Sequence, residues 1–111
     1  MITGVHPGTM ALVSLDSARA QTVRYLKKLS PSQGIALLTY KRDRGLVILC
    51  LDDHAYEVRE FGFINEKSVV TQERIGRLLK TVIKREFPRS HKVRLLKLAS
   101  VDELPGNVHP I

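Results

Sequence analysis

The clearest periodic pattern in the sequence lies in residues 71–86, TQERIGRLLKTVIKRE. Apolar side chains recur there every three or four residues, the spacing that places them on one face of an α-helix. Thr71 is a suitable capping residue and Pro88 disfavours helical geometry before it, so the helix should follow Thr71 and end near 85–87. Ending there would keep Glu86 away from the core. The apolar face is expected to contain Ile75, Leu78, Leu79, Val82 and Ile83.

The charge of the chain is concentrated in the same region. Residues 71–97 contain nine Lys or Arg and two acidic residues, which accounts for the whole formal net charge of +7, whereas the other 84 residues contain nine of each sign. A concentrated positive field attracts polyanions in a way that scattered charge does not. The side of the helix opposite the apolar face carries Arg77, Lys80 and Lys84, flanked by Arg74 and Arg85.

The N-terminal part predicts a strand followed by a helix. Residues 10–15 form a short apolar run suited to a buried strand, and Asp16 or Ser17 offers a side-chain oxygen that could cap a helix. The segment Ser30-Pro31 should stop this helix. Its buried face is expected to contain Ala18, Thr22, Tyr25, Leu26 and Leu29.

Three strands are expected to follow as a meander, over 35–41, 46–51 and 55–63. The second is almost continuously apolar, which is typical of a central strand covered on both faces. In the third, Tyr56 and Val58 fall on one face of the strand, whereas Phe61 and Phe63 fall on the other. We therefore expect a bulge near Glu60 or an early end of the strand. A last strand is expected over 92–98.

The expected order is therefore β-α-β-β-β-α-β, which indicates the α+β class. Each helix must bury its apolar face on a sheet, so we expect a two-layer sandwich. One mixed or antiparallel sheet of about five strands would pack against two helices. The pattern leaves open whether the helices share one face of the sheet.

The length of 111 residues indicates a single domain. We place it at 10–100, after a flexible lead-in at 1–9 and before a tail at 101–111 that contains a possible short helical turn. The one cysteine, Cys50, lies in an apolar run and should be a buried free thiol, which fits a cytoplasmic protein. No apolar stretch approaches the roughly 20 residues of a membrane-spanning helix, so we expect no membrane partner.

The basic pattern favours a small nucleic-acid-binding module rather than an enzyme. Its cations would contact phosphates, and we expect RNA rather than DNA because recognition would depend on backbone and shape. Base stacking has little support, since only Tyr40 or Tyr56 among the aromatic residues is a candidate for exposure. The expected contact residues are Arg74, Arg77, Lys80, Lys84, Arg85, Arg89, Lys92 and Arg94.

Two alternatives remain open at the sequence level. A structural or adaptor subunit could dock on an acidic protein surface, or form a homodimer through an exposed sheet edge. A metal-dependent nuclease could use the acidic residues in the turn before the third strand of the meander and in that strand itself. These residues are Asp52, Asp53, Glu57 and Glu60.

The order of elements resembles that of several families. Helix, three strands, helix is also the order in double-stranded-RNA-binding domains and in the small protein subunits of the signal recognition particle. With the following strand it resembles restriction-endonuclease-like nucleases, which implies an acid on one strand and Glu-x-Lys on the next. Here Glu57-Val58-Arg59 stands at the second position, and arginine is a poor proton acceptor because it stays charged. We therefore expect no catalytic residue, no metal site and no cofactor.

Overall fold

The computed structural model describes residues 10–99, apart from 42, 53, 63, 64, 89 and 90. The expected lead-in at 1–9 and tail at 101–111 lie outside the described residues. The described elements are β1 (Met10–Ser14), α1 (Leu15–Leu26), β2 (Gly34–Leu38), β3 (Gly45–Cys50), β4 (Ala55–Phe61), β5 (Glu66–Thr71), α2 (Ile75–Glu86) and β6 (Lys92–Leu98).

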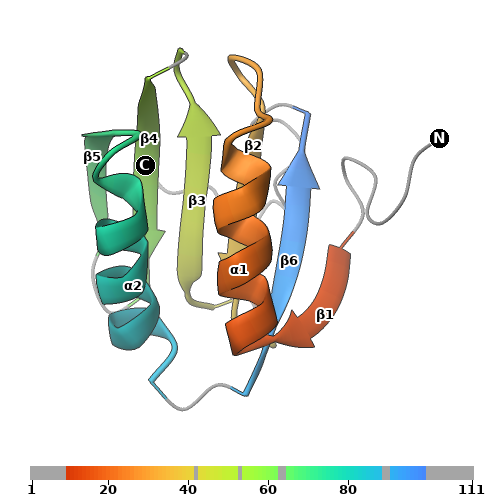
Figure 1. Cartoon of the computed structure of the whole chain (residues 1–111). Coiled ribbons are helices and arrows are strands. Elements are labelled where there is room, and N and C mark those ends of the chain that lie inside the picture. The colour runs from red at the N-terminus through yellow and green to blue at the C-terminus, as the bar shows by residue number, and fades with distance from the viewer. Residues whose placement is uncertain (1–9, 42, 53, 63–64, 89–90, 100–111) are drawn as a thin grey trace, which may run out of the picture.

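The strands form one six-stranded antiparallel sheet in the order β1-β6-β2-β3-β4-β5. Both helices lie on the same face of this sheet (Figure 1). The predicted α+β class and the packing of two helices on one sheet are therefore confirmed. The sheet is antiparallel, and the last strand of the sequence is inserted between the first strand and the meander.

The sequence analysis missed one strand, β5. It lies at the edge of the sheet, where its residues pair only with β4, as Val70 does with Tyr56. Nearly all of its side chains are exposed, so the sequence EKSVVT shows no alternation of buried and exposed residues. Thr71, expected to cap the second helix, is the last residue of this strand. Arg74 occupies the capping position of α2 and makes no side-chain capping bond there.

The first helix begins and ends earlier than expected. Ser14 is its N-cap residue, and the Ser14 hydroxyl oxygen accepts a hydrogen bond from the backbone N–H of Ser17 at 3.2 Å. The expected caps Asp16 and Ser17 are already inside the helix. The helix ends at Leu26, although Leu29 still packs against the core.

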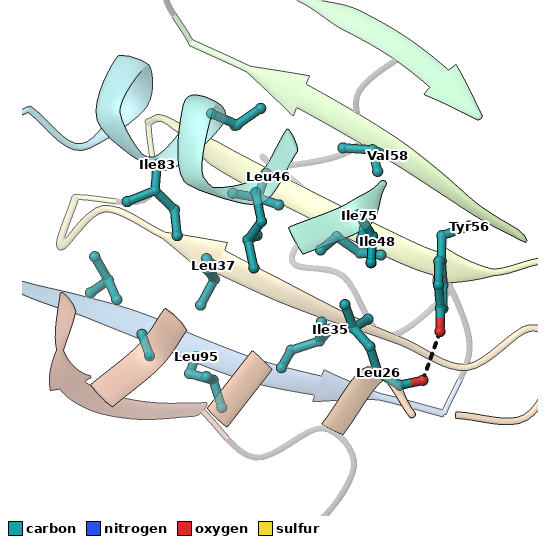
Figure 2. Packing of buried hydrophobic residues seen from close by; sticks show 14 of the residues in the cluster. Leu26, Ile35, Leu37, Leu46, Ile48, Tyr56, Val58, Ile75, Ile83 and Leu95 are labelled. Carbon is teal, nitrogen blue, oxygen red and sulfur yellow. Dashed lines mark hydrogen bonds between the residues drawn. The ribbon is translucent and has the colours of Figure 1, made fainter. Parts of the chain in front are cut away.

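The main core lies between the helices and the sheet (Figure 2). The hydroxyl of Tyr56, on β4, donates a hydrogen bond at 3.0 Å to the carbonyl oxygen of Leu26, the last residue of α1. This bond links the end of α1 to a strand beyond the centre of the sheet. Buried side chains of the two helices meet those of β2, β3, β4 and β6, among them Ile35, Leu37, Leu46, Ile48, Val58, Leu79, Val82 and Leu95.

The opposite face of the sheet carries a second apolar cluster. Its members are 8 % exposed or less, and no helix or strand among the described residues lies over them. Leu12 belongs to the run 10–15 that we expected to form a buried strand, but it is 46 % exposed because it lies on this face in the edge strand β1, opposite Arg94. The cluster consists of Ala36, Leu38, Val47, Leu49, Phe61, Leu96 and Leu98.

The change of phase in β4 has a simple explanation. The pairing of β3 with β4 runs without interruption to Phe61, opposite Gly45, so the strand has no bulge and ends there. Val58 and Glu60 face the helices, whereas Phe61 belongs to the cluster on the opposite face. The early end of the strand is therefore confirmed, and both phases are satisfied because both faces contain apolar side chains.

No helix in the described part of the chain is long and apolar enough to cross a membrane.

The Leu79→Ala substitution should lower the free energy of unfolding by about 2 to 5 kcal/mol, because the Leu79 side chain is 1 % exposed and its removal leaves a cavity under α2. Urea unfolding followed by circular dichroism measures this change. The matched control is Leu12→Ala, which removes the same atoms from an exposed site and should cost about 1 kcal/mol or less. Equal losses for the two variants would show that α2 does not bury the face we assign to it.

Candidate nucleic-acid interface

The outer side of α2 carries a ridge of cations. Arg77, Lys80 and Lys84 are exposed, whereas Leu79 and Val82, on the opposite side of the same helix, are buried. The spacing of three and four residues stacks the cations along the helix. The structure therefore brings these three predicted residues together. Arg74, at the N-terminal end of α2, is exposed as well.

The first helix adds further cations to the same side of the molecule. Sequence reasoning could not place them there, because helical periodicity does not say which face of a sheet a helix covers. Across the two helices and the residues next to their ends, the described exposed side chains include eight cations and two acids, Asp16 and Glu73. The cations are Arg19, Arg24, Lys27, Lys28, Arg74, Arg77, Lys80 and Lys84.

Arg85 is engaged with the core rather than with solvent. Its Nε donates a hydrogen bond to Oε2 of Glu60 at 2.7 Å, and its Nη2 donates to Oε1 of the same carboxylate. The Arg85 side chain is 35 % exposed and that of Glu60 only 4 %. This two-point pairing fixes the guanidinium against β4. The charge of Arg85 is therefore paired with that of Glu60.

Glu86 also differs from expectation. The helix continues through Glu86 and turns its side chain into the core, where it is buried beside Glu60. Burial alone would raise the pKa of Glu60, but hydrogen bonds from Arg85 and Glu86 and the positive charge of Arg85 outweigh it, so the pKa is lowered. The two hydrogen bonds from the guanidinium of Arg85, which stays positively charged, favour the ionised form of Glu60.

The predicted extension of the basic surface beyond α2 lies on the other side of the sheet. The register of β6 places Lys92 and Arg94 on the face that carries Leu96, away from the helices. Nε of Arg94 donates a hydrogen bond to the backbone carbonyl of Tyr40 at 2.8 Å, and its guanidinium lies 4.6 Å from the centre of the Tyr40 ring. The eight predicted residues therefore do not form one surface. Arg89 lies outside the described residues.

The acidic residues considered for metal binding are dispersed. Glu57 lies on the face opposite the helices and is paired with Arg59, whereas Glu60 points toward the helices. An oxygen of the Asp52 side chain accepts a hydrogen bond from the backbone N–H of His54 at 2.7 Å, as expected of a turn. Asp53 lies outside the described residues. Among those that are described, no three such side chains gather where they could hold a metal ion.

Comparison with known proteins adds no relative: no family model, no curated protein and no solved structure matches this chain. Its function therefore has to be argued from its own surface.

The Glu60→Gln substitution should lower the stability of the protein at pH 7, because it removes the charge that pairs with Arg85. A carboxylate with a lowered pKa stabilises the fold above its ordinary pKa of about 4.5 and loses that effect as the pH falls through its folded value. The difference in urea midpoint between wild type and variant should therefore shrink from pH 7 to pH 3.

The control for this experiment is Glu73→Gln at pH 7, which alters an exposed acid and should change the midpoint little. A stability difference for Glu60→Gln that stays constant or grows on acidification would contradict the assignment of the charged form to Glu60.

Proposed function

We propose that this protein is a non-enzymatic nucleic-acid-binding module that contacts RNA phosphates through the outer side of α2. The observation that supports this most directly is the ridge of Arg77, Lys80 and Lys84. In the described part of the chain, none of these three side chains is in an ion pair. Their charges are therefore available to an external anion.

The dimensions of the ridge suit a run of phosphates. A helix rises about 1.5 Å per residue, so the residues from Arg77 to Lys84 cover roughly 10 Å of helix axis. Long Lys and Arg side chains on this length can each reach a separate phosphate of a nucleic-acid strand. The cations of α1 on the same side of the sheet strengthen the field that attracts the strand.

Contacts of this kind hold the backbone and do not read base edges. The outer sides of the helices present flexible cations and no exposed aromatic ring in the described residues. Recognition by backbone and shape is the common way in which proteins bind double-stranded RNA. This is why we name RNA as the ligand class and expect little dependence on sequence.

An acidic protein surface is the second candidate for the partner that binds the α2 ridge. The edge strand β5 offers a different means of association, with a second copy of the chain. This strand is an outer strand of six residues with almost entirely exposed side chains, and Val69 on it is 66 % exposed. Such an edge could pair with a second copy of the chain. The absorbance ratio at 260 and 280 nm after purification without nuclease separates these readings, because only the RNA-binding protein should carry excess absorbance at 260 nm.

Metal-dependent nuclease activity is the third candidate. Glu57 and Glu60 point to opposite sides of β4, so this arrangement does not bring the two acids to one metal ion. The geometry therefore offers this activity the least support.

Reversal of charge on the ridge, by combining Arg77→Glu, Lys80→Glu and Lys84→Glu, should abolish binding of mixed-sequence RNA and leave the fold intact, since all three side chains are exposed. For the wild type, four phosphate contacts, with Arg74 as the fourth, should give a slope of log affinity against log salt of about −3 to −4. Fluorescence anisotropy with labelled RNA at several salt concentrations measures both quantities.

The matched control reverses three exposed cations in and just after α1, namely Arg24, Lys27 and Lys28. This variant changes the net charge by the same amount on the same side of the sheet and should weaken binding much less. Equal losses of affinity in the two triple variants would mean diffuse attraction to a basic protein and would exclude the α2 surface as a specific site.

A further inference from the structure

Tyr40 is an exposed aromatic ring in a basic surrounding. It lies just after β2, in the connection to β3, and its side chain is 65 % exposed, whereas Tyr56, the other candidate for exposure, is buried. The exposed Lys41 follows it. A single exposed side chain of this kind is common on protein surfaces. What distinguishes Tyr40 is the arginine that packs against its ring.

The guanidinium of Arg94 supports one side of this ring. It lies 4.6 Å from the ring centre, and its Nε is held by the carbonyl oxygen of Tyr40. An arginine placed in this way makes a cation–π contact and limits the motion of the ring. With 65 % of the side chain still exposed, much of the ring surface remains open to a flat ligand.

Hydrogen bonds hold Thr39, the residue that precedes Tyr40. The backbone N–H of Thr39 donates to the carbonyl of Arg44 at 2.9 Å, and the N–H of Arg44 donates to the Thr39 hydroxyl at 3.3 Å. The Thr39 hydroxyl in turn donates to Asp43 at 2.7 Å, and this bond lowers the pKa of Asp43, so the carboxylate stays ionised. A ring next to a residue held in this way, and in contact with Arg94, loses less conformational freedom when a ligand binds.

We propose that Tyr40, supported by Arg94, is a stacking site for one unpaired base of a single-stranded RNA segment. A nucleobase has a flat face that stacks on an aromatic ring whatever its sequence, and nearby cations hold the phosphates of the same strand. Lys92 lies on the same face of β6 as Arg94, two residues before it, and can serve this purpose. Base-paired RNA cannot use the site, because its bases are stacked on one another.

The position of the site relates it to the ridge on α2. The connection from β2 to β3 lies at the end of the sheet where α2 ends and β6 begins (Figure 1). A strand that follows α2 toward Lys84 therefore reaches the end of the sheet that carries Tyr40. The stacking site rests on the proposed function in that both need RNA to bind, but it lies on the opposite face of the sheet and can be altered separately.

The experiment compares three labelled probes by fluorescence anisotropy: twelve uridines, an abasic strand with the same number of phosphates, and a twelve-base-pair RNA duplex. Tyr40→Ala should weaken binding of the uridine strand about tenfold, in line with the loss of one stacked base. Its affinity for the abasic strand and for the duplex should stay within about twofold of wild type. Tyr40→Phe, which retains the ring, should bind all three probes like wild type.

The controls separate this proposal from the proposed function. Val69→Ala alters an equally exposed apolar side chain elsewhere and should change no affinity. The triple reversal on α2 should weaken binding of all three probes, since it removes phosphate contacts. If that variant binds normally while Tyr40→Ala does not, the stacking site stands and the α2 surface is wrong.

Two results would overturn the stacking site itself. One is unchanged binding of the uridine strand by Tyr40→Ala. The other is an equal loss on the uridine and abasic strands, which would assign Tyr40 a role in the structure of the hairpin rather than in base contact. If the wild type binds none of the probes, both proposals fail.

Discussion

The structure depends on the insertion of β6 between β1 and β2. The last described strand pairs with the first strand through Leu96 and Met10 and with β2 through Leu96 and Ala36. Among the described strands, β1 pairs with β6 alone, so without β6 it would have no partner in this sheet. Its side chains Val93, Leu95, Leu96 and Leu98 are 2 % exposed or less and contribute to both apolar clusters. The strand β6, buried on both faces, thus connects β1 to the meander of β2, β3 and β4 within one sheet.

The two-sided burial of the central strands also determines where charge can lie. Apolar side chains fill both faces of β2 and β3, so these two strands carry no charged residue, and the cations lie on the helices, on the other strands and in the connections. Charge is buried in the group formed by Glu60, Glu86 and Arg85 at the end of α2. There the guanidinium of Arg85 makes two hydrogen bonds to the buried carboxylate of Glu60, and removal of Arg85 would leave that buried charge without this partner.

The sheet divides the basic residues into two surfaces. The ridge on α2 faces outward from the helical layer, whereas Arg94 faces the other way and supports Tyr40. A surface of flexible cations is suited to a phosphate backbone, and a supported aromatic ring is suited to a base. The two surfaces are therefore complementary in chemistry. They come nearest to each other at the end of the sheet where α2 ends and β6 begins, and an RNA strand bound there could contact both.

The sequence by itself determined the features that depend on local periodicity. The apolar face of residues 75–83, the continuous run of β3 and the cationic ridge at Arg77, Lys80 and Lys84 follow from spacing along the chain, and the structure places these side chains as that spacing requires. A helix or a fully buried strand repeats its environment at a fixed interval. Such a pattern can therefore be recognised from the sequence of the segment alone.

Tertiary structure alone decided the rest, because it depends on partners distant in sequence. β5 is a strand through its backbone bonds to β4, and Glu86 is buried next to Glu60, a residue of β4. The sequence predicted that Arg94 extends the ridge. Side chains alternate between the two faces of a strand, however, and the pairing of β6 with its neighbours places Arg94 on the face away from the helices. Strand order, the shared face of the helices and the split of the basic residues into two surfaces were fixed by packing. No periodicity within a single segment contains that information.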